Sequence, residues 1–596
     1  MKKLVILLLI ISLVFSFSGC KKAEDSHIVV GSVTTPSGDV SGFWNNNATD
    51  TGVKELVMGA STVALDQNGE YLIDTNAMKE HSITENADGS KTAVFKINDA
   101  LTWSNGEKIT AKDYVFTCLF FSGKFAVETL GAVNANAGFY FDGYSEYANG
   151  DTNVFSGVRL IDESSFSVTI DKDNLPYYYE TYLYTVLPTY MKGWSGCLID
   201  IADDGNGCYF VGELNDKVAQ AANEYRFSQS AFSGAYSIES FDTANAAYTL
   251  KRNEKYIGNF EGQKPVIEKV TVKEVRAETM LDELRTGSVD IIVRMSDGAI
   301  ITEGLTSVKG NEFKAASYDN AGYAYIMFNC SVGAASSTAV RQALAHLLDR
   351  EQLTRDYTLG SGKVVNALYG MGMNEYAERK DELDKLNSYP YDPEKAKELL
   401  ISDGWIYDKN GSEYKDGIRY KNIDGELTPL VINWASVQGN ALAELISVHL
   451  VNNPDLIKCG IKIEETPMTF SQMYSAHFMN PDEDHFNMYS LSMPRFTPLF
   501  DESGFWELGS DQNASHLDNE ELEYLSKAMV LVDGSDKEGY LDLFVSFNEK
   551  INELLPCLPL YSTTYTDFYS NRLKNYDGIT TYWGWYSQLP YAQIGE

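Results

Sequence analysis

Apolar and polar residues alternate along this chain with two distinct periods. A period of two, as in HIVVGSVTT (27–35) and LTPLVINWA (427–435), predicts strands with one buried face. A period near 3.6, as in TAVRQALAHLLDREQL (338–353), places Val340 and Leu344 on one stripe and predicts a helix that faces a core. Strands and helices follow each other throughout the chain, so we expect an α/β fold with mixed sheets.

Several helix ends are also visible in the sequence. Thr110, with Asp113 three residues later, predicts a helix whose first turn is capped. Asp392 before Pro393 predicts a second such start, because proline suits the first turn of a helix. Gly287 predicts the C-terminal end of another helix, since glycine adopts the left-handed conformation there at little cost.

The first 26 residues have the pattern of an export signal followed by a tether. Two lysines precede an uncharged apolar run from Leu4 to Phe17, which is too short to span a bilayer as a helix. The next residues, Ser18-Gly19-Cys20, resemble the bacterial lipobox, in which the cysteine is acylated and the chain is cut before it. We therefore expect a lipoprotein signal peptide at 1–19, a lipidated Cys20 and a tether at 20–26. An ordinary signal peptide with an incidental cysteine is the alternative.

Composition narrows the function classes. A chain of 596 residues with 44% apolar and 22% charged residues is ordinary for globular protein and long enough for three or four domains. Its formal net charge is −36 and it has no basic run, so we do not expect nucleic acid as a partner. The 38 tyrosines are suited to gripping a ligand through flat faces with polar tips, although a large core uses aromatic residues as well.

The cysteines leave one candidate disulfide. Cys197 and Cys208 flank the loop GCLIDIADDGNGCY and can close it in an oxidising compartment. The remaining cysteines apart from Cys20 lie in apolar surroundings and are expected to be small buried hydrophobic residues; they are Cys118, Cys330, Cys459 and Cys557.

Motifs for catalysis or a bound metal are weak. The sequence has no HExxH and no GxSxG motif, and LGSGKV (359–364) lacks the first glycine and the final Ser or Thr of a phosphate loop. HFMNPDEDH (477–485) is more typical of a solvated acidic turn than of a metal site. The segment from Asp200 to Asn206 has the character of a calcium loop without the acid spacing of an EF-hand. We expect no enzyme activity, no cofactor and no metal site, with calcium at 200–206 left open.

Fragments spread along the chain resemble one family in family order. LTWSNGEKITAKDYVFT is similar to its "fsdGtpltAeDVvfs" signature, and FSGAYSIESFDTANAAYTLKRNEKYIG to "GpYkvvefdpgqkivlerNpdYwg". MLDELRTGSVDII, IMFNCSVGAASSTAVRQALAHLLDRE, YDPEKAKELLISDGW, CGIKIEE and LPLY also have counterparts. The family is the extracellular oligopeptide/dipeptide/nickel-binding family, the solute-binding lipoproteins of ABC importers.

This resemblance implies a type II periplasmic-binding-protein-like fold with two main lobes and an extra side lobe. The chain is expected to cross between the main lobes near 316–318 and to return near 546–556. The implied boundaries are 27–66, 186–316 and 550–596 for lobe I, 67–185 for the side lobe, and 317–549 for lobe II.

The resemblance also implies a function. The protein is expected to capture peptides in the cleft between the lobes and to deliver them to the permease subunits of an ABC importer. The expected form is a monomer, anchored by lipid on the outer face of the bacterial plasma membrane. Two acyl chains hold a protein on a membrane durably, whereas one does not.

Ligand contacts are expected where strands end, because ligands of open α/β sheets lie beyond the carboxyl ends of the strands. Two loops and the start of lobe II meet this condition. The candidates are Phe43, Trp44, Asn45, Tyr318, Asp319, Tyr323, Trp434, Ser436 and Gln438. For each of them, a role in a core or a loop is the alternative.

No Asp stands where the resemblance implies an acid, and Arg495 lies close to that point. Peptide binders of this family often have a "WgaDypDP" stretch whose acid pairs with the peptide ammonium, and HFNMYSLSMPRFTPLF (485–500) is the corresponding segment. A cation there repels an ammonium and attracts a carboxylate. The ammonium anchor is therefore relocated or absent, unless Arg495 pairs with a nearby acid such as Asp501.

Other functions remain open at this stage. Trp44, Trp434, Trp583 and Trp585 can stack on sugar rings, so an oligosaccharide is an alternative ligand, as is a nickel chelate. A receptor that senses a peptide signal without import is a different class of function. An extracellular hydrolase is a third class, with no motif in its favour.

Overall fold

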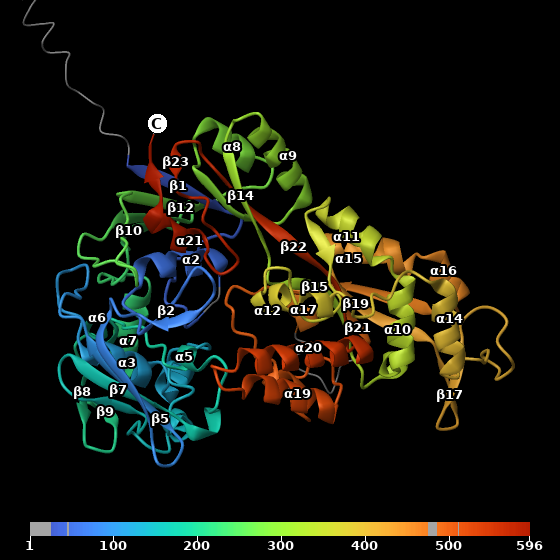
Figure 1. Cartoon of the computed structure of the whole chain (residues 1–596), viewed down its shortest axis with the longest axis horizontal. Helices are drawn as coiled ribbons and strands as arrows, with labels where there is room; N and C mark the ends of the chain where they lie inside the picture. The colour runs from blue at the N-terminus through green and yellow to red at the C-terminus, as the bar shows by residue number, and fades with distance from the viewer. Residues whose placement is uncertain (1–25, 45–46, 475–484, 511, 596) are drawn as a thin grey trace, which may run out of the picture.

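Strand β22 (Cys557–Tyr569) is shared by two large lobes and joins them through one mixed sheet of twelve strands (Figure 1). Its first residues pair with β15 (Tyr323–Phe328) in lobe II, and its last residues pair with β13 (Ile291–Met295) and β14 (Lys314–Asp319) in lobe I. The computed structural model describes residues 26–44, 47–474, 485–510 and 512–595. The lobes are therefore connected by hydrogen-bonded strands.

Lobe I is built on the N-terminal strand. β1 (His27–Ser32) lies parallel to both β12 (Lys269–Glu274) and β13. Its alternation buries Ile28 and Val30 completely in one core, which α2 (Ala48–Val57) shares. Val29 packs against a second core on the other face. The other elements of the lobe are β10 (Tyr236–Asp242), β11 (Ala247–Arg252), α8 (Met280–Thr286), α9 (Gly298–Lys309) and α21 (Trp585–Gln588).

The side lobe is an antiparallel sheet covered by α3 (Ala111–Phe120). The predicted capping of α3 is confirmed, because the Asp113 carboxylate accepts a hydrogen bond from the Thr110 N–H at 2.9 Å. The strands in spatial order are β4 (Met78–Glu85), β5 (Lys91–Ile97), β7 (Ser165–Ile170) and β6 (Val158–Leu160).

This lobe extends further along the chain than the predicted limit of 185. Helix α7 (Asp216–Arg226) packs on α6 (Met191–Ser195), and the hairpin of β8 (Asp200–Asp203) and β9 (Cys208–Val211) packs on α3. Buried residues of α7, such as Ala222, belong to the same core as α3. The hydrophobic face of α7 therefore places the end of the side lobe at the end of this helix.

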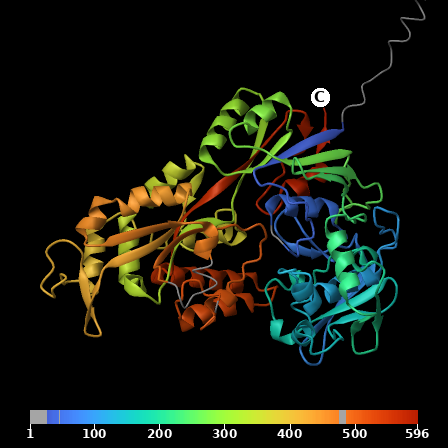
Figure 2. The same cartoon turned by 180° about the vertical axis from the view of Figure 1, so that it is seen from behind.

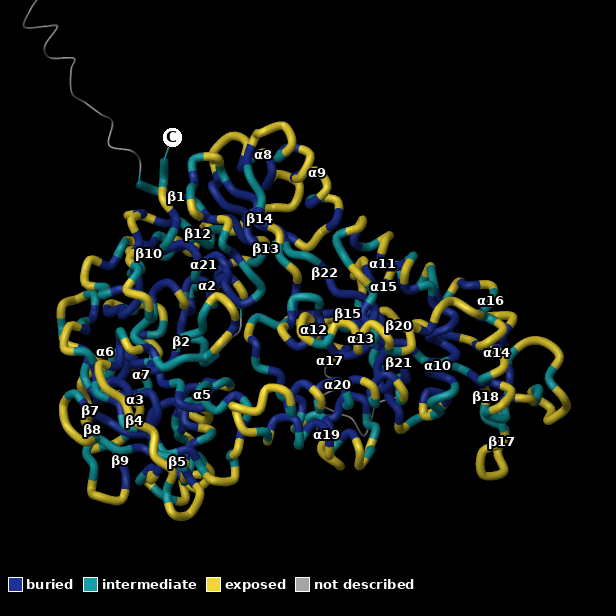
Figure 3. Tube along the Cα trace, in the orientation of Figure 1, coloured by how far each residue is buried: buried dark blue, intermediate teal, exposed yellow. Residues whose placement is uncertain are grey.

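Lobe II has its own core around β19 (Val431–Val437), and Figure 3 shows this core and those of the other lobes in dark blue. The single helix predicted over 338–353 is wrong, because α10 (Thr338–Leu347) ends before α11 (Arg350–Thr358) begins. The Asp349 carboxylate accepts a hydrogen bond from the Gln352 N–H at 2.9 Å. A side chain that caps a new helix start competes with continuation of the first helix.

The remaining elements complete the chain. In lobe II they include α14 (Pro393–Ser402), where the predicted Asp392 cap is confirmed, together with β20 (Lys462–Met468) and β21 (Met488–Met493). Helices α19 (Glu520–Val530) and α20 (Lys537–Leu554) lie between lobe II and the side lobe (Figure 2). Shorter elements are β2 (Val63–Leu65), β3 (Tyr71–Ile73), α4 (Tyr144–Asn149), α5 (Glu180–Leu183), β16 (Gly362–Val364), α12 (Asn374–Glu378), α13 (Lys380–Leu383), β17 (Tyr420–Ile423), β18 (Glu426–Pro429), α15 (Ala441–Ile446), α16 (Pro454–Lys458), α17 (Phe470–Tyr474), α18 (Ser503–Trp506), β23 (Leu573–Lys574) and β24 (Gln593–Ile594).

The two crossings between the lobes lie beside each other. The first runs through 320–322, just after the predicted 316–318, where β14 ends and β15 begins. The return crossing lies inside β22, because Tyr561 still pairs with β15 whereas Thr564 pairs with β14. This is later than the predicted 546–556, since the strand continues unbroken through the crossing.

The predicted disulfide between Cys197 and Cys208 is absent, because both residues are free cysteines. Cys208 pairs with Asp203 at the turn end of the β8–β9 hairpin, whereas Cys197 precedes the other end of that hairpin. At about 3.3 Å per strand residue, the hairpin holds the two sulfurs too far apart for a bond. The prediction that Cys118, Cys330, Cys459 and Cys557 are buried is confirmed.

The calcium alternative at 200–206 has no support in the structure. Asp200 pairs with Lys112 at 2.5 Å and Asp203 pairs with Arg159 at 2.7 Å, so cations of the protein already balance these carboxylates. Within the described ranges, no group of three or more metal-ligating side chains occurs and no helix is long and apolar enough to span a bilayer. The predicted signal peptide, Cys20, most of the tether and most of the acidic turn at 477–485 lie outside the described residues.

Candidate functional site

One short stretch of lobe II lines three cavities between the lobes. It comprises residues 493–498, follows β21, and is called the interlobe segment below. Phe496 and Thr497 line a cavity of about 470 Å³ against lobe I and the side lobe, called the main cavity. Pro494 lines a hinge cavity of about 200 Å³, and Pro498 lines a third cavity of about 520 Å³. The space between the lobes is therefore organised around this segment.

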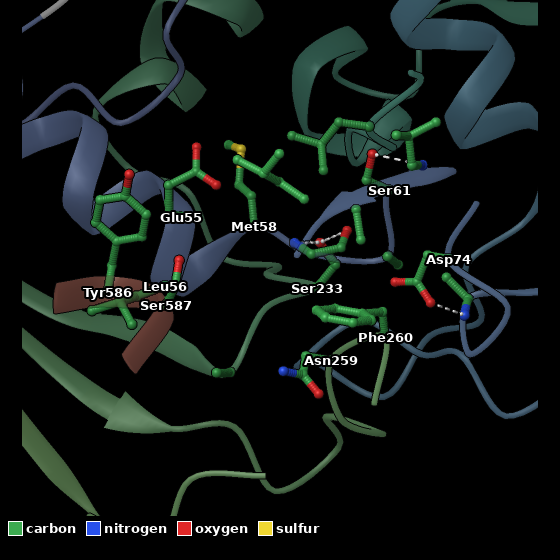
Figure 4. Close-up of a pocket in the computed structure, with 18 of the residues that line it drawn as sticks. Glu55, Leu56, Met58, Ser61, Asp74, Ser233, Asn259, Phe260, Tyr586 and Ser587 are labelled. Carbon is green, nitrogen blue, oxygen red and sulfur yellow. Dashed lines mark hydrogen bonds between the residues drawn. The ribbon is translucent and has the colours of Figure 1, made fainter. Parts of the chain in front are cut away.

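The main cavity is walled mostly by apolar and aromatic side chains. Helix α2 and the loop that follows it form one wall, and Phe260 and Tyr586 project into the space from other parts of lobe I (Figure 4). The side lobe adds Tyr71 and Tyr182, whose ring centroids are 5.1 Å apart. Such walls can hold a solute mainly through apolar contact, and they require few polar groups at fixed positions on the solute.

Charges in the main cavity are few and mostly compensated. Lys54 Nζ lies 3.3 Å from Glu55 Oε1. The Asp74 carboxylate accepts hydrogen bonds from the Asn76 and Ala77 N–H groups, both at 2.9 Å. Burial nevertheless raises the pKa of Asp74, because the charged form is removed from water.

Arg294 brings a positive charge next to the main cavity, because it contacts Phe496 and Tyr586, which line that cavity. It lies in β13 at an irregular pairing with β22 and has a backbone φ of 56°, which is uncommon for a residue other than glycine. Its guanidinium carbon is 4.4 Å from the centre of the Phe496 ring. The Nη2 atom lies 3.5 Å from the Tyr586 hydroxyl. A residue of lobe I thus contacts the interlobe segment directly.

Asp567 of β22 lies behind Arg294 and is completely buried. Its carboxylate accepts hydrogen bonds from the Arg294 backbone N–H at 2.7 Å and from the Tyr576 hydroxyl at 2.9 Å. Burial raises the pKa of Asp567 to about 6, although these hydrogen bonds favour the charged form.

The hinge cavity is lined by aromatic residues from both lobes. Tyr323 begins β15, Tyr565 belongs to β22, and Ser492 is the residue before the last of β21. Arg495 forms a buried ion pair with Glu502, and its guanidinium carbon lies 4.5 Å from the centre of the Phe500 ring. The charge of Arg495 is therefore compensated within lobe II.

The third cavity contains a buried carboxylate. Glu375 Oε1 accepts hydrogen bonds from the Tyr540 hydroxyl at 2.9 Å and the Tyr179 hydroxyl at 3.1 Å. Its Oε2 has no hydrogen-bond partner among the described residues. Burial raises the pKa of Glu375, which favours its neutral form.

The residues expected to bind ligand are distributed unevenly. Tyr323 lines the hinge cavity, and the Tyr318 hydroxyl lies 3.4 Å from Asp567. Asp319 is exposed and accepts a hydrogen bond from the Thr564 hydroxyl at 3.3 Å. Tyr323 pairs with Met493 at the end of β21, and Arg495 follows two residues later within the interlobe segment.

The candidates from the first loop pack against the side lobe instead. Phe43 stacks on Phe121 with ring centroids 3.6 Å apart, and Trp44 stacks on Trp194 at 5.9 Å. Asn45 lies outside the described residues.

Those from β19 and the loop after it do not line the three cavities. Trp434 and Ser436 are buried, whereas Gln438 is exposed just beyond the strand.

Several residues that line this space were not predicted from the sequence. Tyr71, Tyr182 and Tyr586 are aromatic residues in segments without a motif, and Phe496 lies in the segment 485–500, where attention fell on Arg495. Their positions depend on the meeting of three lobes. Arg294 alone carries a local signal, because a charged residue interrupts the apolar strand IIVRM.

Comparison with known proteins identifies the fold and the family. The model of bacterial extracellular solute-binding proteins, family 5 (middle), matches residues 77–514. The oligopeptide-binding protein AppA of Bacillus subtilis is 23% identical over 548 residues, which cover 91% of this chain and 87% of AppA.

Two solved structures are similar over almost the whole chain. Lactococcal OppA, complexed with an endogenous peptide in the closed conformation, aligns with a TM-score of 0.70 and 16% identity, covering 96% of this chain and all of that one. The periplasmic EDTA-binding protein EppA aligns with a TM-score of 0.71 and 16% identity, covering 96% of each chain. At these identities the likeness establishes the type II binding-protein fold.

Proposed function

This chain belongs to family 5 of the bacterial extracellular solute-binding proteins, and on that premise we propose that it captures peptides between its lobes and delivers them to an ABC permease. The observation that carries this proposal is the interlobe segment, residues 493–498, which lines three cavities between the lobes. A solute held there contacts several lobes at once, so binding and closure favour each other.

The hinge is suited to such closure. The two crossings, at 320–322 and within β22, lie side by side and are the strands that join the main lobes. A small change in backbone angles at two adjacent strands can rotate one lobe against the other without breaking either core. A permease then needs to recognise only the closed arrangement.

Peptides fit the chemistry of the walls. Aromatic side chains, including those of tyrosines, offer contact area to peptide side chains of many kinds. Polar groups of the protein can form hydrogen bonds with the peptide backbone. The relatives named as oligopeptide-binding proteins support this choice of solute.

We also propose that lipid on Cys20 holds the protein on the outer face of the plasma membrane. A tether of a few residues keeps the protein close to its permease and raises its local concentration there. The N-terminal pattern of basic residues, apolar run and Ser-Gly-Cys supports this part of the proposal.

A carboxylate chelate is the second candidate solute. It is favoured by the guanidinium of Arg294, which forms no ion pair with a described residue and contacts Phe496 and Tyr586 of the main-cavity wall. Oligosaccharide is less favoured, because Trp434 and Trp585 are buried in the cores of the lobes and Trp44 packs on Trp194. Trp583 is the member of that set that lines the main cavity.

Native mass spectrometry of the purified protein, followed by identification of released molecules, tests the solute class directly. We expect peptides, and small-angle scattering should show a more compact protein when they are present than after they are removed. Release of a chelate or a sugar instead of peptide, or an identical scattering profile in both states, would rule out the function as proposed.

A further inference from the structure

Arg294 is a half-buried arginine in an otherwise apolar strand of lobe I. Among the described residues its guanidinium forms no ion pair, and the nearby Asp567 carboxylate accepts from the backbone N–H of Arg294 instead. Burial of a charge without an ion pair is costly. A guanidinium stays protonated at any physiological pH, so it cannot avoid this cost by losing its proton.

The carboxylate nearest along the sheet does not bind this guanidinium. Asp567 accepts its hydrogen bonds from the backbone N–H of Arg294 and from the hydroxyls of Tyr576 and Tyr318. Its charge helps to hold a cation in this region, but its oxygens face other donors. The side chain of Arg294 therefore keeps donor capacity of its own.

The N–H groups that remain available lie at one edge of the guanidinium. Phe496 stacks against its face, and Nη2 approaches the Tyr586 hydroxyl at 3.5 Å. Nε and Nη1 of Arg294 have no hydrogen-bond partner among the described residues. Gly584 leaves room for this placement, since a Cβ there would come within 3.2 Å of Nη2.

The other cations around the three cavities are already paired. Lys54 contacts Glu55 at the main cavity, and Arg495 contacts Glu502 beside the hinge cavity. Lys537 at the third cavity lies 2.7 Å from Glu378. Arg294 contacts Phe496 and Tyr586 of the main-cavity wall and, unlike these three cations, forms no ion pair with a described residue.

We propose that Arg294 binds a carboxylate of the captured solute through its free edge, while Phe496 of lobe II closes over its face. This inference rests on the function proposed above and narrows its solute class to molecules with a carboxylate within reach of the lobe boundary. A free peptide C-terminus or an acidic side chain has the planar geometry that a guanidinium binds with two hydrogen bonds. Closure of the lobes then depends on the charge of the solute as well as on its presence.

The test compares pools of hexapeptides of random sequence by competition for the protein after its bound solutes have been removed. One pool lacks Asp and Glu and has amidated C-termini, a second differs only in having free C-termini, and a third is amidated but contains one Glu. We expect at least one carboxylate-bearing pool to bind tenfold or more tightly than the carboxylate-free pool.

Variants assign that preference to a residue. In Arg294→Gln the preference for carboxylate-bearing peptides should fall to less than threefold. In Arg294→Lys it should be intermediate, because lysine keeps the positive charge but cannot form two parallel hydrogen bonds with a carboxylate as a guanidinium does. Arg285→Gln removes the same charge from the ion-paired surface of lobe I and should keep the full preference. Thermal unfolding of each variant shows whether it is folded, and the pool comparison on the unmodified protein does not depend on any variant.

The outcomes separate this inference from the function on which it rests. Equal affinity of the unmodified protein for all three pools, or a full preference in folded Arg294→Gln, overturns the role of Arg294 and leaves peptide capture supported. Failure of every pool to bind overturns peptide capture itself.

Discussion

The guanidinium of Arg294 in lobe I lies against the ring of Phe496 in lobe II, with 4.4 Å between its central carbon and the ring centre. This contact spans the boundary between the main lobes, which are otherwise joined there through the strands of the hinge. A cation on an aromatic face contributes about 0.5–2 kcal/mol, depending on how far both groups are removed from water. The contact is therefore strong enough to bias closure and weak enough to open again.

Replacement of Phe496 by Ala should weaken solute binding. Loss of the contact with Arg294 and of one wall of the main cavity is expected to lower affinity on the order of three- to tenfold and to enlarge the solute-bound particle in scattering. Phe470→Ala is a suitable control, because Phe470 is 56% exposed in the same lobe. Equal losses in both variants would show that the Phe496 contact has no special role in closure.

Asp567 should make stability depend on pH. Its folded-state pKa of about 6 is above the ordinary value of 3.8, so the folded state binds more protons than the unfolded state between these values. Its contribution to stability is therefore present at low pH and is lost as pH rises through 6. Between pH 5 and 7.5 the loss is about 1 kcal/mol.

Asp567→Asn removes this titration and keeps a side chain of the same shape. Urea unfolding at pH 5 and pH 7.5 should show a smaller loss of stability on going to the higher pH in the variant than in the unmodified protein. Other carboxyl groups titrate in both proteins, so only the difference between the two pH effects is attributed to Asp567. An equal pH effect in the two proteins would mean that Asp567 does not titrate between pH 5 and 7.5 in the folded protein.

The six cysteines outside the signal region should all be free thiols. Alkylation of the folded protein is expected to label Cys197 first, because it is exposed, whereas burial raises the pKa of the Cys118 and Cys557 thiols. Unfolding without a reductant should expose the remaining thiols to the same reagent. Recovery of a peptide that links Cys197 to Cys208 would contradict the structure.

Cys20 should determine membrane attachment. We expect Cys20→Ser to move the protein from the membrane fraction to the medium, because the chain then has no acylation site at this position. Mass spectrometry of the N-terminal peptide from the unmodified protein should find two or three acyl chains on Cys20. A variant that stays in the membrane fraction after a salt wash would show that some other feature anchors the chain.

Local chemistry was visible in the sequence because it depends on neighbours along the chain. The Asp113 cap, the Asp392–Pro393 helix start and the glycine that ends α8 are each set by residues within one turn of a helix. The break between α10 and α11 was missed, although Asp349 carries its signal, because the apolar stripe runs through it. Periodicity alone does not distinguish one long helix from two that share a face.

By itself, the sequence determined the α/β class, the family resemblance and many of the elements, because alternation and capping are local properties that survive without tertiary context. Only the tertiary structure decided the end of the side lobe, the crossing within β22 and the residues that line the cleft. Arg294, Phe496 and Tyr586 are far apart in the chain, and their meeting depends on how three lobes pack. The same packing pairs Arg495 with Glu502, whereas Arg294 forms no ion pair with any described residue. Pairing depends on distance in space and not on position along the chain.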